Sequence, residues 1–111
     1  MYKLRFSKLY KSDVDSSYNY IKDKLEAPMA ADNLIKEILE KLNKIKENPN
    51  IRPLVQDEYL ASFGYRLINV KNYAIFYIID NDNKYIKIIR FLYKKRNWIN
   101  ILKEKTVEEM M

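Results

Sequence analysis

Residues 65–93, YRLINVKNYAIFYIIDNDNKYIKIIRFLY, decide the fold. Three stretches within them, 65–70, 73–79 and 85–93, are rich in β-branched and aromatic residues, which favour strands. Lys71-Asn72 separates the first two stretches, and this spacing is typical of a two-residue hairpin with Asn72 at a left-handed position. Residues 80–83, Asp-Asn-Asp-Asn, supply the second turn. The segment therefore predicts three consecutive antiparallel strands.

The first half of the chain predicts a strand and then two helices. Residues 2–6 alternate apolar and polar side chains, as in a strand with one buried face. Ser7 or Ser12 is expected to cap a helix whose apolar stripe recurs every three or four residues: Tyr10, Val14, Tyr18, Ile21 and Leu25. Pro28 interrupts that pattern and suits the first turn of a second helix, from about residue 29 to 47. The expected buried face of the second helix is Ala31, Leu34, Ile35, Ile38, Leu39, Leu42 and Ile45.

The remaining segments are less regular. Pro49 and Pro53 predict an irregular stretch from 48 to 62. Trp98 is expected to begin a short closing helix, and residues 104–111 a frayed tail. The predicted fold class is α+β, in the order β-α-α-β-β-β(-α). An N-terminal helical hairpin packs on one face of a mainly antiparallel, twisted sheet, and the other face stays partly open. Residues 1–111 are expected to form a single domain.

Composition narrows the chemistry. The chain has no cysteine and no histidine, which excludes disulfides, thiolate chemistry and the commonest metal ligand. Its carboxylates have no metal-ligand spacing, and no nucleotide-binding fingerprint is present, so we expect no metal and no cofactor. No segment resembles a signal peptide or a membrane span, so a cytoplasmic location is expected. The net charge is +6, and residues 63–103 alone hold nine basic and two acidic side chains.

That asymmetry predicts a face for nucleic acid or for an acidic protein, although it would also serve solubility alone. The densest cations are Lys94, Lys95 and Arg96, which lie between Tyr93 and Trp98. These three cations could contact phosphates or a protein. Alternatively, they form a solvated strand end, while Tyr93 and Trp98 are buried in the core. We expect Arg66 and Arg90, on neighbouring strands, to join Lys95 and Arg96 in one groove. Lys71 and Lys87 are further basic positions on the same sheet, where they could also protect a strand edge.

The motifs in residues 64–98 resemble the RelE/ParE superfamily of bacterial toxins. The quoted pieces are GYRL (64–67), VKNYAIFY (70–77) and IIRFLYKKRNW (88–98), and they are most similar to the ParE-like, plasmid-stabilisation branch. The resemblance implies the toxin of a type II toxin–antitoxin pair. It implies a cognate antitoxin, expected to be acidic, and a growth-inhibiting activity with no small-molecule cofactor and no membrane.

The resemblance leaves the target open between DNA gyrase, as for ParE-like toxins, and mRNA on the ribosome, as for RelE-like endonucleases. A ParE-like poison of gyrase is favoured, with target-binding residues Lys71, Arg90, Lys94, Lys95, Arg96 and Trp98. The alternative is a metal-independent, ribosome-dependent mRNA interferase whose catalytic residues would be Arg66, Tyr93, Lys95 and Arg96. Two departures count against it, because an arginine and a tyrosine of those nucleases correspond to Ala74 and to a position near Leu102. A third hypothesis is an inactive remnant that only binds an antitoxin.

Overall fold

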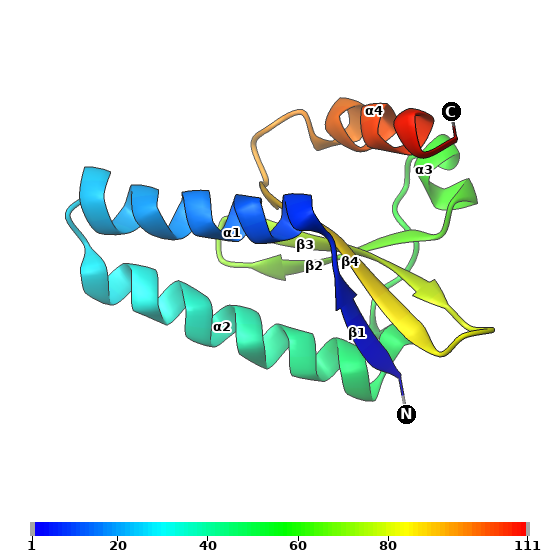
Figure 1. Ribbon diagram of the computed structural model, residues 1–111, viewed down its shortest axis with the longest axis horizontal. Helices are drawn as coiled ribbons and strands as arrows, with labels where there is room; N and C mark the ends of the chain where they lie inside the picture. The colour runs from blue at the N-terminus through cyan, green and yellow to red at the C-terminus, as the bar shows by residue number, and fades with distance from the viewer. Residues whose placement is uncertain (1, 111) are drawn as a thin grey trace.

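The computed structural model describes residues 2–110, and the side chains of residues 2–104. Figure 1 shows two long helices, a twisted sheet and a C-terminal helix that lies above it. The elements are β1 (Lys3–Phe6), α1 (Lys8–Asn19), a π-helical turn (Tyr20–Lys24), α2 (Pro28–Glu47), a 3-10 turn (Pro49–Ile51), α3 (Glu58–Ser62), β2 (Tyr65–Val70), β3 (Tyr73–Asp80), β4 (Tyr85–Tyr93) and α4 (Trp98–Met110).

The four strands form one sheet in the order β1-β4-β3-β2. Strand β1 is parallel to β4, and the other two pairings are antiparallel, as predicted from residues 65–93. Val70 pairs with Tyr73, which confirms the two-residue hairpin. The left-handed residue of that turn is Lys71, with φ 54°, and not Asn72. The sheet therefore has β1 and β2 as its two edges.

Helices α1 and α2 form the predicted hairpin and cover one face of the sheet (Figure 1). The Ser7 hydroxyl accepts a hydrogen bond from the Tyr10 N–H at 2.9 Å, so Ser7 caps α1. Pro28 occupies the first turn of α2, where its missing N–H costs nothing. The buried residues of α2 are Ala31, Leu34, Ile38, Leu42 and Ile45.

Leu39 is the exception on α2, because its side chain is 56% exposed. It lies about 90° around the helix from the centre of the buried stripe, by the 3.6-residue repeat. The prediction that Leu39 belongs to the buried face is therefore wrong.

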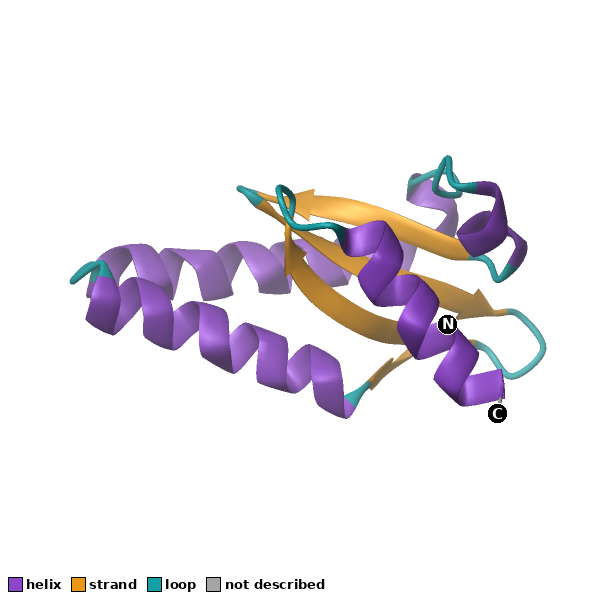
Figure 2. Ribbon diagram, turned by 90° about the horizontal axis from the view of Figure 1, so that it is seen from above, coloured by secondary structure: helices purple, strands orange, loops and turns teal. Residues whose placement is uncertain are grey.

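Helices α3 and α4 cover part of the opposite face and build a second core with it; Figure 2 shows α4 crossing over the sheet. The prediction of irregular structure from 48 to 62 is wrong at Glu58–Ser62, because the Asp57 carboxylate accepts from the Leu60 N–H at 3.0 Å and starts α3. Helix α4 continues to Met110, well into the expected frayed tail. The side chains of 105–110, and residue 111, lie outside the described residues. In the described part of the chain, no helix has the length and apolar character needed to cross a membrane.

Candidate target-binding site at one end of the sheet

Four exposed cations gather where the β2–β3 turn meets the segment after β4. The Lys94 N–H donates to the Asn72 carbonyl at 2.8 Å, which joins the two turns. A tight turn follows, in which the Arg96 N–H donates to the Tyr93 carbonyl at 3.0 Å. We call Lys71, Lys94, Lys95 and Arg96 the end cluster. All four are exposed, and none forms an ion pair with any carboxylate whose side chain is described.

A hollow of about 490 Å³ opens beside the end cluster, and Arg96 is one of the residues that line it. Its wall is aromatic: the Tyr73 and Phe91 rings stack with centroids 4.8 Å apart, and Tyr93 lies 5.5 Å from Tyr73. The remaining lining residues come from α1 and the turn after it: Asp13, Ser16, Ser17 and Tyr20. A cation beside an aromatic wall suits a group that is partly apolar and partly acidic.

Arg90 does not contribute a free charge to this site. Its Nε lies 2.7 Å and its Nη2 2.9 Å from the two carboxylate oxygens of Asp13 on α1, and both side chains are largely buried. Strand β1 pairs only with residues 85–88 of β4, so the last residues of β4 form an edge. Asp13 also accepts from the Phe91 N–H at 3.0 Å, and thereby closes part of that edge. Arg90 and Asp13 together fasten α1 to the sheet.

Arg66 lies at the other edge of the sheet. Its Nη1 donates to the Arg52 carbonyl at 2.5 Å, while the Arg52 Nε donates to the Leu67 carbonyl at 3.3 Å. The Val55 N–H also donates to the Tyr65 carbonyl at 3.0 Å. Together these three hydrogen bonds hold residues 52–55 against the outer edge of β2. Burial raises the pKa of the neighbouring Tyr77, and the charges of Arg66 and Arg52 oppose that rise.

The prediction of one groove for Arg66, Arg90, Lys95 and Arg96 is therefore wrong. Strand β3 separates β2 from β4, so residues on those two strands are not neighbours. Arg66 is bonded outward to the 49–54 segment, and Arg90 to α1. Of the expected catalytic set, Tyr93 and Arg96 line one hollow, Lys95 follows in the adjacent turn, and Arg66 is apart.

Two positions that separate the target hypotheses lie in the second core. Ala74 is 2% exposed and packs on the face that α3 and α4 cover. Leu102 of α4 is fully buried in the same cluster. Neither position opens to solvent, so neither could present a polar side chain to a nucleic acid.

Trp98 is half-buried, with its ring centroid 5.1 Å from that of Phe76. It also lines a second hollow of about 470 Å³, together with Leu67, Ile99 and residues 52–57. Trp98 is therefore partly a core residue and partly accessible. The sequence had left open whether it is a core aromatic or a contact residue.

Asp13 and Arg52 were not singled out as sites from the sequence, although both determine how the cations are placed. Asp13 follows Tyr10 by three residues, so it lies beside the buried stripe of α1; a carboxylate there is a signal that it has a partner. Arg52 has no comparable signal, because it lies between prolines in a loop. No group of three or more carboxylates that could hold a metal ion occurs among the described side chains.

The arrangement of a helical hairpin on a four-stranded sheet resembles solved structures from toxin–antitoxin systems. The chain resembles the chromosomal ParDE TA system from P. aeruginosa, with a TM-score of 0.68, 18% identity, and coverage of 84% of this chain and 96% of that chain. It also resembles the toxin-antitoxin complex RelBE2 from Mycobacterium tuberculosis, with a TM-score of 0.54, 15% identity, and coverage of 83% and 96%. At these identities the likeness shows the fold.

The family follows from the sequence itself. The model of the ParE toxin of the type II toxin–antitoxin system parDE matches residues 4–98. The chain belongs to this family and is the toxin component of a type II toxin–antitoxin system, with a cognate antitoxin as its partner. A comparison with curated proteins gave no match.

Proposed function

We propose that this toxin inhibits growth by binding and poisoning DNA gyrase, and that it does not cut RNA. The observation that carries the proposal is the interior location of Ala74 and Leu102. The resemblance aligns an arginine of the RelE-like nucleases with Ala74 and a tyrosine with a position near Leu102, and here Ala74 and Leu102 are both packing residues. Losing a positioned charge and a proton donor costs a phosphoryl-transfer enzyme orders of magnitude in rate.

The contact surface in this proposal is the end cluster, the hollow beside it and the tip of the helical hairpin. The end cluster supplies four cations without an ion pair among the described side chains, and the hollow supplies an aromatic wall that it shares with Arg96. The hairpin adds apolar side chains near its tip: Tyr20 is 53%, Leu25 55% and Met29 79% exposed. Cations that border exposed apolar groups are typical of a protein-binding surface.

We propose in addition that the antitoxin is acidic and neutralises the toxin by covering the end cluster. The net charge of +6 supports this, because opposite charges steer the association of two proteins. Both partners and the target would meet in the cytoplasm. A reading frame for a small acidic protein beside that of the toxin supports this pairing, and a basic neighbour would contradict it.

An mRNA interferase is the second candidate, because Tyr93 and Arg96 line the same hollow and Tyr93 could serve there as the acid or base. Without Arg66 within reach, this candidate has one phosphate-binding guanidinium in place of two.

Expression of the toxin in a bacterial host, without its antitoxin, tests the proposal. Gyrase poisoning predicts induction of the DNA-damage response while mRNA stays intact. Ribosome-phased mRNA ends without DNA damage would contradict the proposal and select the interferase. Unimpaired growth, with the protein confirmed as folded and present, would leave only an antitoxin-binding remnant.

A further inference from the structure

A second group of cations lies at the opposite end of β4 from the end cluster. The parallel register pairs Lys3 with Tyr85 and Arg5 with Lys87. The residues between them, Leu4 and Ile86, pack against the core under the helical hairpin. Because side chains alternate along a strand, Lys3, Arg5, Tyr85 and Lys87 share the face away from the hairpin.

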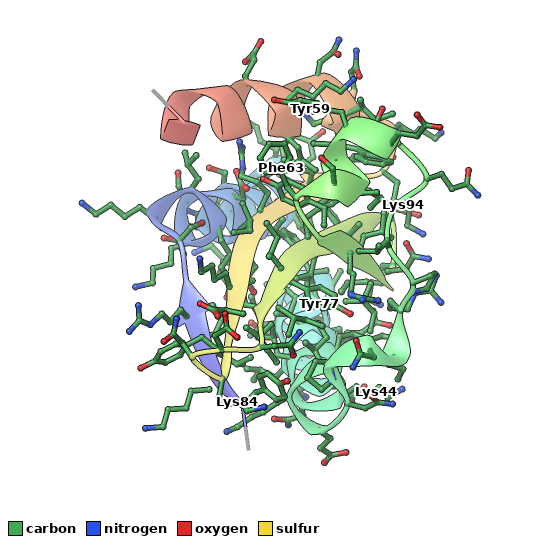
Figure 3. The ribbon with its side chains drawn as sticks, turned by 90° about the vertical axis from the view of Figure 1, so that its right-hand side faces the viewer. Lys44, Tyr59, Phe63, Tyr77, Lys84 and Lys94 are labelled. Atoms are coloured by element: carbon green, nitrogen blue, oxygen red, sulfur yellow. The ribbon has the colours of Figure 1, made fainter. Side chains whose placement is uncertain are left out.

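Lys84 adjoins these residues, because its carbonyl accepts from the Lys3 N–H at 3.0 Å. We call Lys3, Arg5, Lys84 and Lys87 the β1–β4 cationic face. Figure 3 shows Lys84 well separated from Lys94 of the end cluster. The toxin therefore carries two distinct basic surfaces, one at each end of β4.

The charges of the β1–β4 cationic face are positioned but not neutralised. The Arg5 guanidinium lies 3.8 Å from the centroid of the Tyr85 ring, and the Lys84 ammonium lies 5.2 Å from that of Tyr2. Contact with an aromatic ring orders a cation and leaves its charge in place. All four cations are exposed, and none forms an ion pair within the described side chains.

The carboxylates near this face are those of Asp80 and Asp82 in the β3–β4 turn. The Asp80 oxygens already accept from the Asn83 N–H at 3.1 Å and from the Asn83 side-chain amide at 2.9 Å. Lys87 acts on Asp80 only beyond ion-pair distance. This region thus has four cations and two carboxylates, and its net charge is positive.

We propose that the β1–β4 cationic face binds the phosphate backbone of double-stranded DNA. Phosphates on one DNA strand rise about 3.4 Å per nucleotide along the duplex axis, and residues two apart on a strand are about 6.6 Å apart. Lys3 and Arg5 on β1 are therefore far enough apart to contact different phosphates, and Lys87 extends the row across to β4. The proposal goes beyond gyrase poisoning and does not depend on which target the toxin attacks.

The aromatic rings decide between duplex and single-stranded nucleic acid. Proteins that bind single strands offer free aromatic faces on which bases stack. Here the Tyr85 and Tyr2 rings already carry Arg5 and Lys84. The surface is therefore better suited to backbone phosphates than to base stacking.

Titration of a fluorescent 20-base-pair duplex with the purified toxin, at several salt concentrations, tests this assignment by anisotropy. Four phosphate contacts predict a slope of log K against log salt near −3.6, or about 150-fold weaker binding at 200 mM than at 50 mM salt. The variant Arg5→Gln/Lys87→Gln should lower the magnitude of the slope by about 1.8. Circular dichroism of each variant checks that it is folded.

Two matched variants control the experiment. Lys36→Gln/Lys44→Gln removes two exposed charges from α2, outside the β1–β4 cationic face, and should leave the slope unchanged. Lys94→Gln/Lys95→Gln removes two exposed charges from the end cluster and should also leave the slope unchanged. The proposal is overturned if only the end-cluster variant reduces the slope, if all variants reduce it equally, if wild-type binding is independent of salt, or if a single strand binds more tightly than the duplex.

Discussion

Among single residues, Arg90 and Arg96 have opposite roles. Arg90 is largely buried and bonded to Asp13, whereas Arg96 is exposed and lines a hollow. Removing one partner of a buried ion pair leaves the other charge without compensation, while an exposed charge contributes little to stability.

Arg90→Ala should therefore lower the free energy of unfolding by about 3 kcal/mol. Denaturant titration measures it. The double variant Asp13→Asn/Arg90→Met should recover part of that loss, because it removes both charges together. Additive losses in Asp13→Asn, Arg90→Met and the double variant Asp13→Asn/Arg90→Met would show that the pair is not coupled.

Arg96→Ala should leave the free energy of unfolding within about 0.5 kcal/mol of wild type and abolish toxicity. A thermal melt of the purified variant measures its stability, and the growth of cells that express it measures its toxicity. Lys46→Ala, an exposed cation at the end of α2, is the matched control and should stay toxic. An unfolded Arg96→Ala protein would show that the arginine is structural.

At the scale of elements, the strands could be predicted from the sequence and the small helices could not. The alternation and β-branched content of residues 65–93 placed β2, β3 and β4 within one residue of their observed bounds. Helix α3 was missed because five residues are too few for a helical repeat to show. Its one local signal was Asp57, an N-cap residue followed by no apolar stripe.

Asp57 also makes α3 sensitive to acid. The hydrogen bond from the Leu60 N–H lowers its pKa below the usual 3.8, and Lys103, whose ammonium lies 3.4 Å from the carboxylate, adds to this effect. A lowered pKa means that the contribution to stability is present above pH 3.8 and is lost as the pH falls through the folded-state value.

Asp57→Asn should therefore melt at nearly the wild-type temperature at pH 7, because asparagine also caps helices, but lose less stability than wild type below pH 4. Asp57→Ala should be destabilised at both pH values. Asp80, whose pKa is lowered by Asn83, keeps part of the acid sensitivity in every variant. Parallel acid limbs for wild type and Asp57→Asn would contradict this account.

At the scale of the whole molecule, the fold and the family could be predicted from the sequence, while the arrangement of the cations could not. Strand periodicity assigns residues to faces, but it does not show which partner each cation finds. With β3 between β2 and β4, Arg66 and Arg90 are separated, and each finds a local partner. The end cluster was predictable in part, because Lys94, Lys95 and Arg96 are consecutive.

We propose that the toxin acts on gyrase through the end cluster. To test this, purified toxin is mixed with purified gyrase, ATP and supercoiled plasmid, and the protein is then denatured. The quantity measured is the amount of plasmid linearised by trapped gyrase. Linear DNA is expected with wild-type toxin and with Lys46→Ala, and none is expected with Arg96→Ala. Absence of linear DNA with folded wild-type toxin, combined with cleavage of mRNA on purified ribosomes, would contradict it.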